Sequence, residues 1–497
     1  MLFSIYGRSR SPLALIVSGC ISSILVLHFL YASEILPGTR PKAIDPATLL
    51  ARQSTFWRSF YPDLVKFGPN CDALTHPEDT HLNVPYDASD TNRTRPDRLS
   101  MSASQVLQLR ATHTSLTTQL KSKDYILPYL QKSRGIVTTA GGSHLPVAVL
   151  SIRMLRRTGS ELPVEVFLAS QEEWDPQICD VVFLAMNARC VVLQDIFDAA
   201  GDDKSLRIGK DQYKIMSIVF SSFEEVLFMD SDCFPVFDPS EIFDSEPFQS
   251  TSLILWPDFW FPSESPFFFE VAQIPAPAIY NRSSTESGEI FYSKKKHKNS
   301  LLLALYYNYY GPDFYYPLQS QGAPGEGDKE TFLWSAIVFD EPLYTVRKGV
   351  SALGYTMMKG EWRASATVQY DPRGDLEIQS RLDLRTEQKL QAQQRPLFVH
   401  ASFPKFDPAT MFLEEAVDAS GPTRDTNGTI RRVWHATEVE GIKLFGFDLE
   451  RRFWEEIRNM TCEYEGSFSA WAGSSDMCAN AILHWQTLFE PSDAQYN

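Results

Sequence analysis

Two aspartates close an apolar run in the segment Glu224-Glu-Val-Leu-Phe-Met-Asp230-Ser-Asp232. Carboxylates two residues apart can converge on one hard divalent cation and on the phosphates that such a cation carries. The pattern alone is weak evidence for a metal site, because a chain with many aspartates contains such pairs by chance. A solvated turn after a core strand is the alternative interpretation. A metal site therefore has to be supported by the elements that would position the pair.

The apolar run at 226–229 shows no polar alternation, which predicts a strand buried on both faces of an α/β sheet. Pro235 and Pro239 end the strand pattern shortly afterwards. We therefore expect Asp230 and Asp232 at the carboxyl edge of the sheet, where open α/β folds bind ligands.

A second strand is predicted at 136–140 and leads into Gly141-Gly142 and a helical pattern from Val147 to Leu155. A strand, a glycine pair and a helix N-terminus form a cradle for the phosphates or sugar of a nucleotide. We expect Thr138, Gly141 and Gly142 to contribute to it. The segment is neither a dinucleotide fingerprint nor a P-loop.

Lys214 and His400 are two further candidates for this site. Lys214 lies on a helix predicted at 211–220; we favour an exposed position, with a nucleotide-facing side chain as the alternative. His400 ends the apolar strand Pro396-Leu-Phe-Val-His. Most single histidines are structural, but a placement like that of Asp230 makes His400 a candidate metal ligand.

Three further acids are candidate catalytic carboxylates, because they flank glycine-containing segments that can approach a sugar closely. Glu286 precedes Gly288, and Asp328 and Glu330 end the glycine loop at 322–332. That loop either folds over a sugar, or its acids charge the first turn of the next helix.

Aromatic and basic residues between these segments have two interpretations each. Trp256 and Trp260 either offer flat surfaces to acceptor sugar rings or belong to the core. The run Lys294-Lys-Lys-His-Lys298 opens a helix, where cations oppose the dipole, and either serves a ligand or forms a solvated face.

The whole chain has 497 residues and a net charge of −16, without a basic stripe, which argues against nucleic acid as a partner. Residues 11–33 carry no formal charge and are long enough to cross a bilayer. Arg8 and Arg10 precede them, so the positive-inside rule leaves the N-terminus in the cytosol and the rest of the chain in the lumen. A cleaved signal peptide is the alternative.

Sequons and cysteines agree with a lumenal chain. The sequons begin at Asn92, Asn281, Asn427 and Asn459. Six of the seven cysteines lie outside the predicted span, and only Cys462 and Cys478 are close enough in sequence to propose as a disulfide.

The predicted organisation has five parts. Residues 1–10 form a cytosolic tail and 11–33 a transmembrane anchor. Residues 34–133 form a stem and helical linker, because prolines interrupt its first part and helical spacing appears from Met101 to Leu130. An α/β catalytic domain spans 134–410. Residues 411–497 form a C-terminal extension packed on it.

Taken in order, the motifs resemble the fungal Golgi α-mannosyltransferases that branch cell-wall mannan, over roughly residues 134–410. They are Gly135-Ile-Val-Thr-Thr-Ala-Gly-Gly, Leu162-Pro-Val-Glu-Val, Asn187-Ala-Arg-Cys190, Asp211-Gln-Tyr-Lys214, Leu227-Phe-Met-Asp-Ser-Asp-Cys-Phe-Pro-Val236, Glu286-Ser-Gly288 and Gly325-Glu-Gly-Asp-Lys-Glu-Thr331.

The resemblance implies a single-pass type II protein of the Golgi membrane with a GT-A-type domain, a mixed, mainly parallel sheet flanked by helices. It implies GDP-mannose as donor, Mn²⁺ as cofactor, a mannose-containing glycan as acceptor and retention of configuration. Asp230 and Asp232 match the Asp-x-Asp motif, and His400 is a looser match to the late histidine of the metal shell. The α-1,2 enzymes are the closest likeness; an α-1,3 linkage and an oligomer with other mannosyltransferases remain open.

Two other classes of protein are alternatives to this family. In a haloacid dehalogenase-type hydrolase the motif has Thr or Val two residues after the second aspartate. Phe234 occupies that position here, which argues against this class. A catalytically silent Golgi scaffold or lectin is the other alternative, and the intact acids at Asp230, Asp232, Asp328 and Glu330 speak against it.

Overall fold

The computed structural model describes residues 45–77, 82–201, 208–356, 360–379, 394–412, 423–425, 427–434 and 444–490. From Pro46 onward these residues belong to one unit. The predicted tail and membrane span, residues 1–33, lie outside the described ranges. Inside those ranges, no helix has the length and apolar character needed to cross a bilayer.

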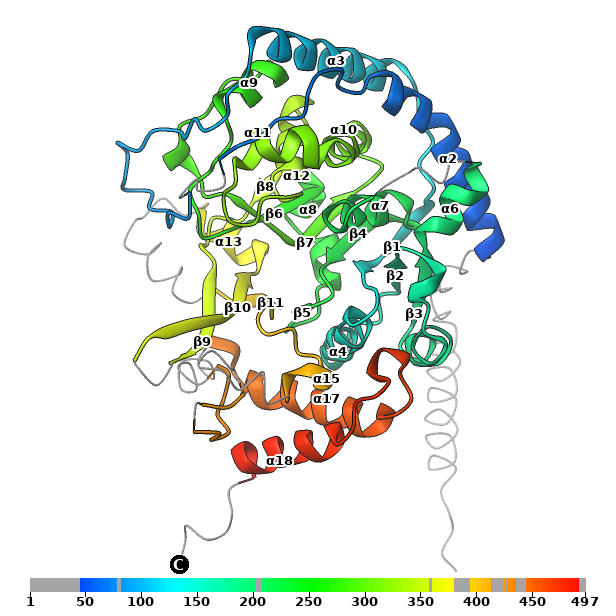
Figure 1. Cartoon of the computed structure of the whole chain (residues 1–497), viewed down its shortest axis with the longest axis vertical. Helices are drawn as coiled ribbons and strands as arrows, with labels where there is room; N and C mark the ends of the chain where they lie inside the picture. Colours follow the sequence, from blue (N-terminus) through cyan, green and yellow to red (C-terminus); the bar gives the residue numbers. More distant parts are fainter. Residues whose placement is uncertain are drawn as a thin grey trace, which may run out of the picture. The chain divides into compact units, whose positions relative to one another are not determined.

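A seven-stranded sheet in the order β3-β2-β1-β4-β7-β6-β8 forms the centre of this unit (Figure 1). Its strands are β1 Leu130–Thr139, β2 Val164–Leu168, β3 Ala188–Val192, β4 Phe223–Met229, β6 Leu253–Pro257, β7 Thr285–Ser293 and β8 Tyr344–Thr345. Only β7 runs antiparallel to its neighbours β4 and β6, which confirms a mixed, mainly parallel sheet. The ends of β1, β4, β6 and β8 therefore lie at the same edge.

The β4 strand is buried on both faces, as its unbroken apolar run predicts. Val226 and Phe228 belong to one core cluster, whereas Leu227 and Met229 belong to the other. Successive side chains of a strand point to opposite faces, so each face needs its own apolar residues.

Helices cover one face of the sheet: α2 Pro46–Lys66, α3 Ala103–Ser122, α7 Tyr213–Phe220, α9 Pro266–Ala272, α10 Lys298–Tyr309 and α12 Thr331–Val338. Figure 1 shows α2 and α3, in blue, along this side, away from α17 and α18 in orange and red. Shorter helices connect the elements: α5 Phe183–Ala185, α6 Leu193–Ala200, α8 Phe248–Thr251, α11 Tyr316–Ser320, α13 Pro372–Gln379 and α15 Pro408–Met411.

The α2 helix differs from the proline-interrupted stem expected in this region. It runs for 21 residues with Pro62 inside it, and it buries Phe56, Trp57, Phe60 and Leu64. An internal proline costs roughly 3 kcal/mol, whereas each large apolar side chain contributes about 1.5–3 kcal/mol on burial. Four such side chains outweigh the proline.

The α3 helix confirms the predicted apolar spacing, because the five side chains at 106, 109, 113, 116 and 120 are all buried. A capping box between Ser102 and Gln105 begins the helix. The helix ends at Ser122 rather than near Pro128, and Leu130 already begins β1.

The other face of the sheet is covered by α4 His144–Arg157, by a second sheet in the order β5-β11-β10-β9, and by the C-terminal helices α17 Leu449–Tyr464 and α18 Met477–Phe489. The second sheet consists of β5 Cys233–Pro235, β9 Ser351–Thr356, β10 Trp362–Tyr370 and β11 Pro396–His400. Ion pairs tie α4 to α17, among them Arg153 with Glu456 at 2.9 Å and Arg157 with Glu455 at 2.7 Å.

Two disulfides are present in the described part of the chain. The predicted bond between Cys462 and Cys478 is confirmed and joins α17 to α18. A second bond, which the sequence did not predict, joins Cys179 to Cys190 in β3.

Within the basic run at 294–298, Lys294 neither faces a ligand nor lies on a solvated surface. This side chain is fully buried, and its Nζ donates to the carbonyls of Ile218, Val219 and Ser221 at the end of α7. Burial lowers the pKa of Lys294 to about 7. Lys294 therefore satisfies the last carbonyls of that helix, where a cation is also favoured by the helix dipole.

Candidate metal and donor site

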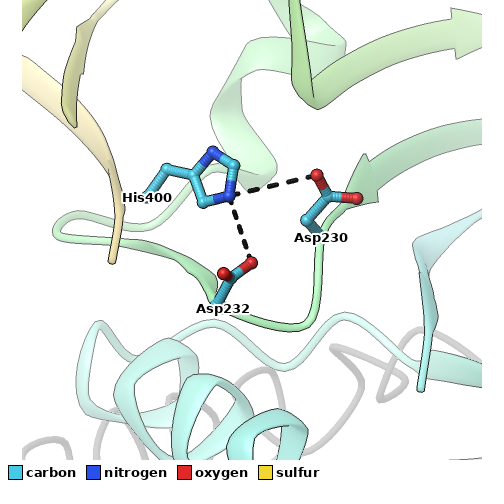
Figure 2. Close-up of side chains that lie close together, drawn as sticks. All are labelled: Asp230, Asp232 and His400. Atoms are coloured by element: carbon cyan, nitrogen blue, oxygen red, sulfur yellow. Dashed lines mark hydrogen bonds and ion pairs between the residues drawn. The ribbon is translucent and has the colours of Figure 1, made fainter. Parts of the chain in front are cut away.

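The link between the two sheets brings the predicted metal ligands together. The chain leaves β4 at Asp230 and turns, and β5 then pairs with β11 so that Cys233 lies opposite His400. Figure 2 shows the side chains of Asp230 and Asp232 pointing toward the His400 ring. One potential ligand atom from each of the three lies within 4.8 Å of the others.

His400 is shared between the two aspartates. Its Nε2 lies 3.1 Å from Asp232 Oδ1 and 4.0 Å from Asp230 Oδ2. Asp232 is 4% exposed, and its second oxygen pairs with Lys405. Burial by itself raises the pKa of Asp232, but His400 and Lys405 outweigh it and hold this pKa well below the usual range.

Glu286 fixes the orientation of the imidazole from the other side. Its Oε1 lies 2.9 Å from His400 Nδ1 and accepts the Gly288 N–H at 2.9 Å. A Cβ at Gly288 would come within 2.6 Å of His400 Nδ1, so the approach requires glycine. A carboxylate behind a histidine is the usual support for a metal-binding imidazole.

These donors suit a divalent cation. Two carboxylates and one imidazole match a divalent metal ion that accepts both oxygen and nitrogen ligands. Burial lowers the pKa of His400, but the Asp232 and Glu286 carboxylates outweigh burial and keep it well above its usual range. Because an imidazole must be neutral to bind a metal, binding would release that proton.

Lys214 points into the site, and the exposed position favoured from its sequence is wrong. Its Nζ donates to Ser287 O at 2.6 Å and lies 3.2 Å from Asp230 Oδ1 and 3.4 Å from Asp328 Oδ2. Burial lowers the pKa of Lys214, but the two carboxylates outweigh burial and raise it. The α7 helix is buried from 214 to 220, so its first turn has no solvent-facing side here.

Asp328 has one oxygen without a hydrogen-bond partner among the described residues. Its Oδ1 accepts the Ser287 hydroxyl at 3.0 Å, whereas its buried Oδ2 has only the ion pair with Lys214. Burial raises the pKa of Asp328 to about 6, against the opposing effect of Lys214. This carboxyl is the best placed of the three predicted catalytic acids.

Glu330 lies outside the cavity, contrary to the catalytic role expected for it. It accepts the Thr285 N–H at 2.7 Å and pairs with Arg282 at 3.0 Å. Arg282 also pairs with Glu264, and Glu264 with Arg95. This buried chain of charges makes Glu330 a structural residue, because a buried carboxylate already paired in this way has no free edge for a ligand.

A cavity of about 300 Å³ opens at the carboxyl edge of the sheet. Its lining includes Thr139, Asp211, Lys214, Asp230, Asp258, Glu286, Ser287, Asp328, Lys329 and His400. Thr139 lines it in place of the predicted Thr138, whose buried hydroxyl has no hydrogen-bond partner in the described structure. Strand alternation turns neighbouring residues to opposite faces and explains this shift by one residue.

The glycine pair forms the turn between β1 and α4 beside this cavity. His144 N–H donates to Gly141 O, and Gly142 has a φ of 53°. A Cβ at Gly141 would lie 2.4 Å from the carboxylate of Glu173, so a larger residue there would require the Glu173 side chain to move. Neither glycine lines the cavity, and the nucleotide cradle stays a prediction.

The two tryptophans predicted as sugar-binding or core residues differ in their burial. Trp256 is fully buried and its Nε1 donates to Tyr370 O at 2.8 Å, so it belongs to the core and cannot present a face to a sugar. Trp260 is half-buried, and its backbone bridges to Pro85.

Several residues of the site were missed from the sequence. Asp258 lines the cavity and its Oδ2 accepts from Lys329 at 2.9 Å. It follows Pro257 at a strand end in the way that Asp230 follows β4, and this signal could have identified it. Lys405 reaches Asp232 through a turn whose path no sequence pattern indicated.

A cavity lined by carboxylates, lysine and histidine at the carboxyl edge of a mainly parallel sheet is typical of an α/β enzyme that acts on a charged ligand. A family described as "Mannosyltransferase putative" matches residues 133–282 and 278–371. The chain belongs to this mannosyltransferase family.

Two curated relatives carry the same activity in their names. Alpha-1,2-mannosyltransferase MNN21 of Candida albicans is 32% identical over 78% of this chain and 67% of its own length. Alpha-1,2-mannosyltransferase MNN24 of the same organism is 30% identical over 73% of this chain and 60% of its own length. Among solved structures, the WbbM bifunctional glycosyltransferase covers 45% of this chain and 40% of its own at 10% identity, with a TM-score of 0.31, too low to support an argument.

Proposed function

We propose that this chain transfers mannose from GDP-mannose to a mannoside acceptor and forms an α-1,2 bond. The names of the relatives support the sugar and the linkage. The observation that carries the proposal is that Asp230 and His400 line the same cavity as Lys214 and Asp328, while Asp232 lies behind them with a ligand atom within 4.8 Å of theirs.

Asp230, Asp232 and His400 would hold Mn²⁺ against the diphosphate of the donor. A cation bound there supplies positive charge that stabilises the departing GDP. Glu286 keeps the imidazole oriented, and Lys214 adds a second positive charge at the same edge.

The proposed transfer retains configuration, because GDP-mannose and the proposed product are both α-linked. Retention requires a carboxylate nucleophile or a same-face displacement in which the leaving phosphate takes the acceptor's proton. Asp328 lines the cavity and its Oδ2 is held by the ion pair with Lys214 alone, and we assign this carboxyl to orient the donor mannose or the acceptor hydroxyl. Glu286 is occupied by His400 and Gly288 and acts as a positioning residue.

We also propose a single-pass type II protein of the Golgi membrane with a GT-A-type catalytic domain facing the lumen. The uncharged segment 11–33 and the basic residues before it support the anchor. The two disulfides support an oxidising compartment.

To test this proposal, the purified full-length protein is incubated with GDP-mannose and an α-1,6-mannan backbone, once in the presence of Mn²⁺ and once in the presence of a chelator. We expect an α-1,2-linked mannose only with the cation. A β-linked product would contradict retention, an α-1,3 product would move the enzyme to the sister subgroup, and no transfer to any mannoside would favour a silent scaffold.

A further inference from the structure

A second cavity of about 640 Å³ adjoins the metal site, and the two cavities share Asp258. Asp258 follows β6, and Val346 and Arg347 in the lining follow the neighbouring parallel strand β8. The second cavity therefore continues along the carboxyl edge of the sheet, away from β1 and toward β8.

The two cavities differ in chemistry. The first is lined mainly by charged side chains, as a metal and a diphosphate require. The second has partly exposed aromatic side chains at Tyr86, Phe259 and Tyr344 and an exposed arginine at its rim, Arg347. Aromatic faces pack against the C–H faces of sugar rings, and the polar groups around them bind hydroxyls, so the lining suits a neutral glycoside.

The aromatic wall is held in place by hydrogen bonds from two segments far apart in sequence. Tyr86 N–H donates to Phe259 O at 2.7 Å, and the Tyr86 hydroxyl donates to Tyr280 O at 2.7 Å. Phe259 N–H in turn donates to Asp258 Oδ1 at 2.7 Å. The wall is thus formed before a ligand arrives, which lowers the entropy cost of binding.

We propose that the second cavity binds the acceptor glycoside, with a hexose ring against Phe259 and the reacting hydroxyl beside Asp258. This inference rests on the proposed mannosyl transfer. In that transfer the acceptor oxygen bonds to C1 of mannose, the bond from C1 to the phosphate oxygen breaks, and the acceptor's proton leaves with GDP. The segment around Tyr86, which the sequence predicts as stem, forms part of the acceptor site.

Kinetics of the full-length protein test the assignment with Phe259→Ala and Arg347→Ala. We expect the KM for α-1,6-mannobiose to rise about tenfold in Phe259→Ala, because the lost aromatic contact removes about 1.4 kcal/mol of binding, and the KM for GDP-mannose to change less than about twofold. Leu107→Ala and Arg110→Ala, in a groove on α3, are matched controls that should change neither value. The reference protein for all four variants is the Asn281→Gln single variant, because Asn281 lines the cavity and belongs to a sequon, so that each KM is compared at the same, unglycosylated site.

Saturation-transfer NMR with α-1,6-mannobiose, GDP and Mn²⁺ separates binding from transfer. Mannobiose signals that weaken in Phe259→Ala and Arg347→Ala, but not in the α3 controls, support the acceptor site. This result would stand even if the unmodified protein transferred no mannose, and then only the proposed function would fail. Unchanged signals and an unchanged acceptor KM in both variants, with transfer intact, would overturn the acceptor site.

Discussion

At the scale of single residues, charges of opposite sign alternate through the site. Lys214 lies between Asp230 and Asp328, and His400 lies between Asp232 and Glu286. A buried charge is costly unless it is paired, so each of these side chains depends on its neighbours. Substitutions that keep the shape and remove the charge are therefore the informative ones.

Asp232→Asn should abolish Mn²⁺-dependent nucleotide binding and lower turnover by about 100-fold or more, because it removes one ligand charge and keeps the side-chain shape. Titration calorimetry with Mn²⁺ and GDP measures the binding, and circular dichroism checks the fold. Asp124→Asn, at an aspartate that is 83% exposed, is the control. Near-normal activity of Asp232→Asn would reject the metal assignment. His400→Ala should also weaken metal affinity, by a smaller factor than Asp232→Asn does.

Asp328→Asn and Glu330→Gln should separate catalysis from stability, although the two acids are two residues apart. Asp328→Asn should lower turnover about 100-fold while the protein stays folded, because the changed carboxyl lines the cavity. Glu330→Gln should instead destabilise the fold by about 3 kcal/mol, because it leaves Arg282 partly unpaired. Assays at saturating donor, together with urea unfolding, measure both effects; the opposite pattern would exchange the two roles.

At the scale of elements, the pairing of β5 with β11 builds the metal site. β5 begins at Cys233, directly after Asp232, and its register places Cys233 opposite His400. A shift of one residue would turn His400 to the other face of its strand. The buried side chains of β11, such as Leu397 and Val399, hold the register, because a shift would move each of them to the other face of the strand and out of its packing contacts.

The α2 helix provides a test of its place in the catalytic unit. Trp57→Ala should lower the free energy of unfolding by about 3–5 kcal/mol, because Trp57 is fully buried beside Phe197 and Phe220. Val65→Ala, at a half-exposed position of the same helix, should change it by less than about 0.5 kcal/mol. Denaturant unfolding of both variants gives the comparison, and equal stabilities would mean that α2 folds apart from the sheet.

At the scale of the whole molecule, each face of the sheet buries a neutral histidine. His113 lies against Tyr307 on the α2 and α3 side, and His484 stacks on Trp454 on the side of the C-terminal helices. Burial lowers the pKa of His113 to about 4 and that of His484 to about 3. Both histidines take up a proton more readily when the chain unfolds.

Stability should therefore fall as pH decreases from about 6.5 toward 4, since the unfolded state binds protons that the folded state excludes. For His113 alone, the loss between pH 7 and pH 5 is about 2 kcal/mol. His113→Gln should reduce the decline in unfolding free energy over this range by that amount. An unchanged pH dependence in the variant would mean that His113 is protonated in the folded state.

The sequence by itself determined those features that depend on neighbours along the chain. The unbroken apolar run before Asp230 specified a doubly buried strand, the spacing in α3 specified its buried face, and the short separation of Cys462 and Cys478 indicated their disulfide. The Asp-x-Asp pair and His400 were also predicted to lie together, because Asp230 follows one buried strand and His400 ends another.

Only the tertiary structure decided which way a side chain points and what it meets. Lys214 enters the site and Glu330 leaves it, and Trp256 belongs to the core, because residues distant in sequence form their surroundings. The α2 helix forms despite Pro62 because the sheet face buries its aromatic residues. Local patterns fix periodicity and strand ends, whereas burial and ion pairing depend on strand order and register, which arise only when the whole chain packs.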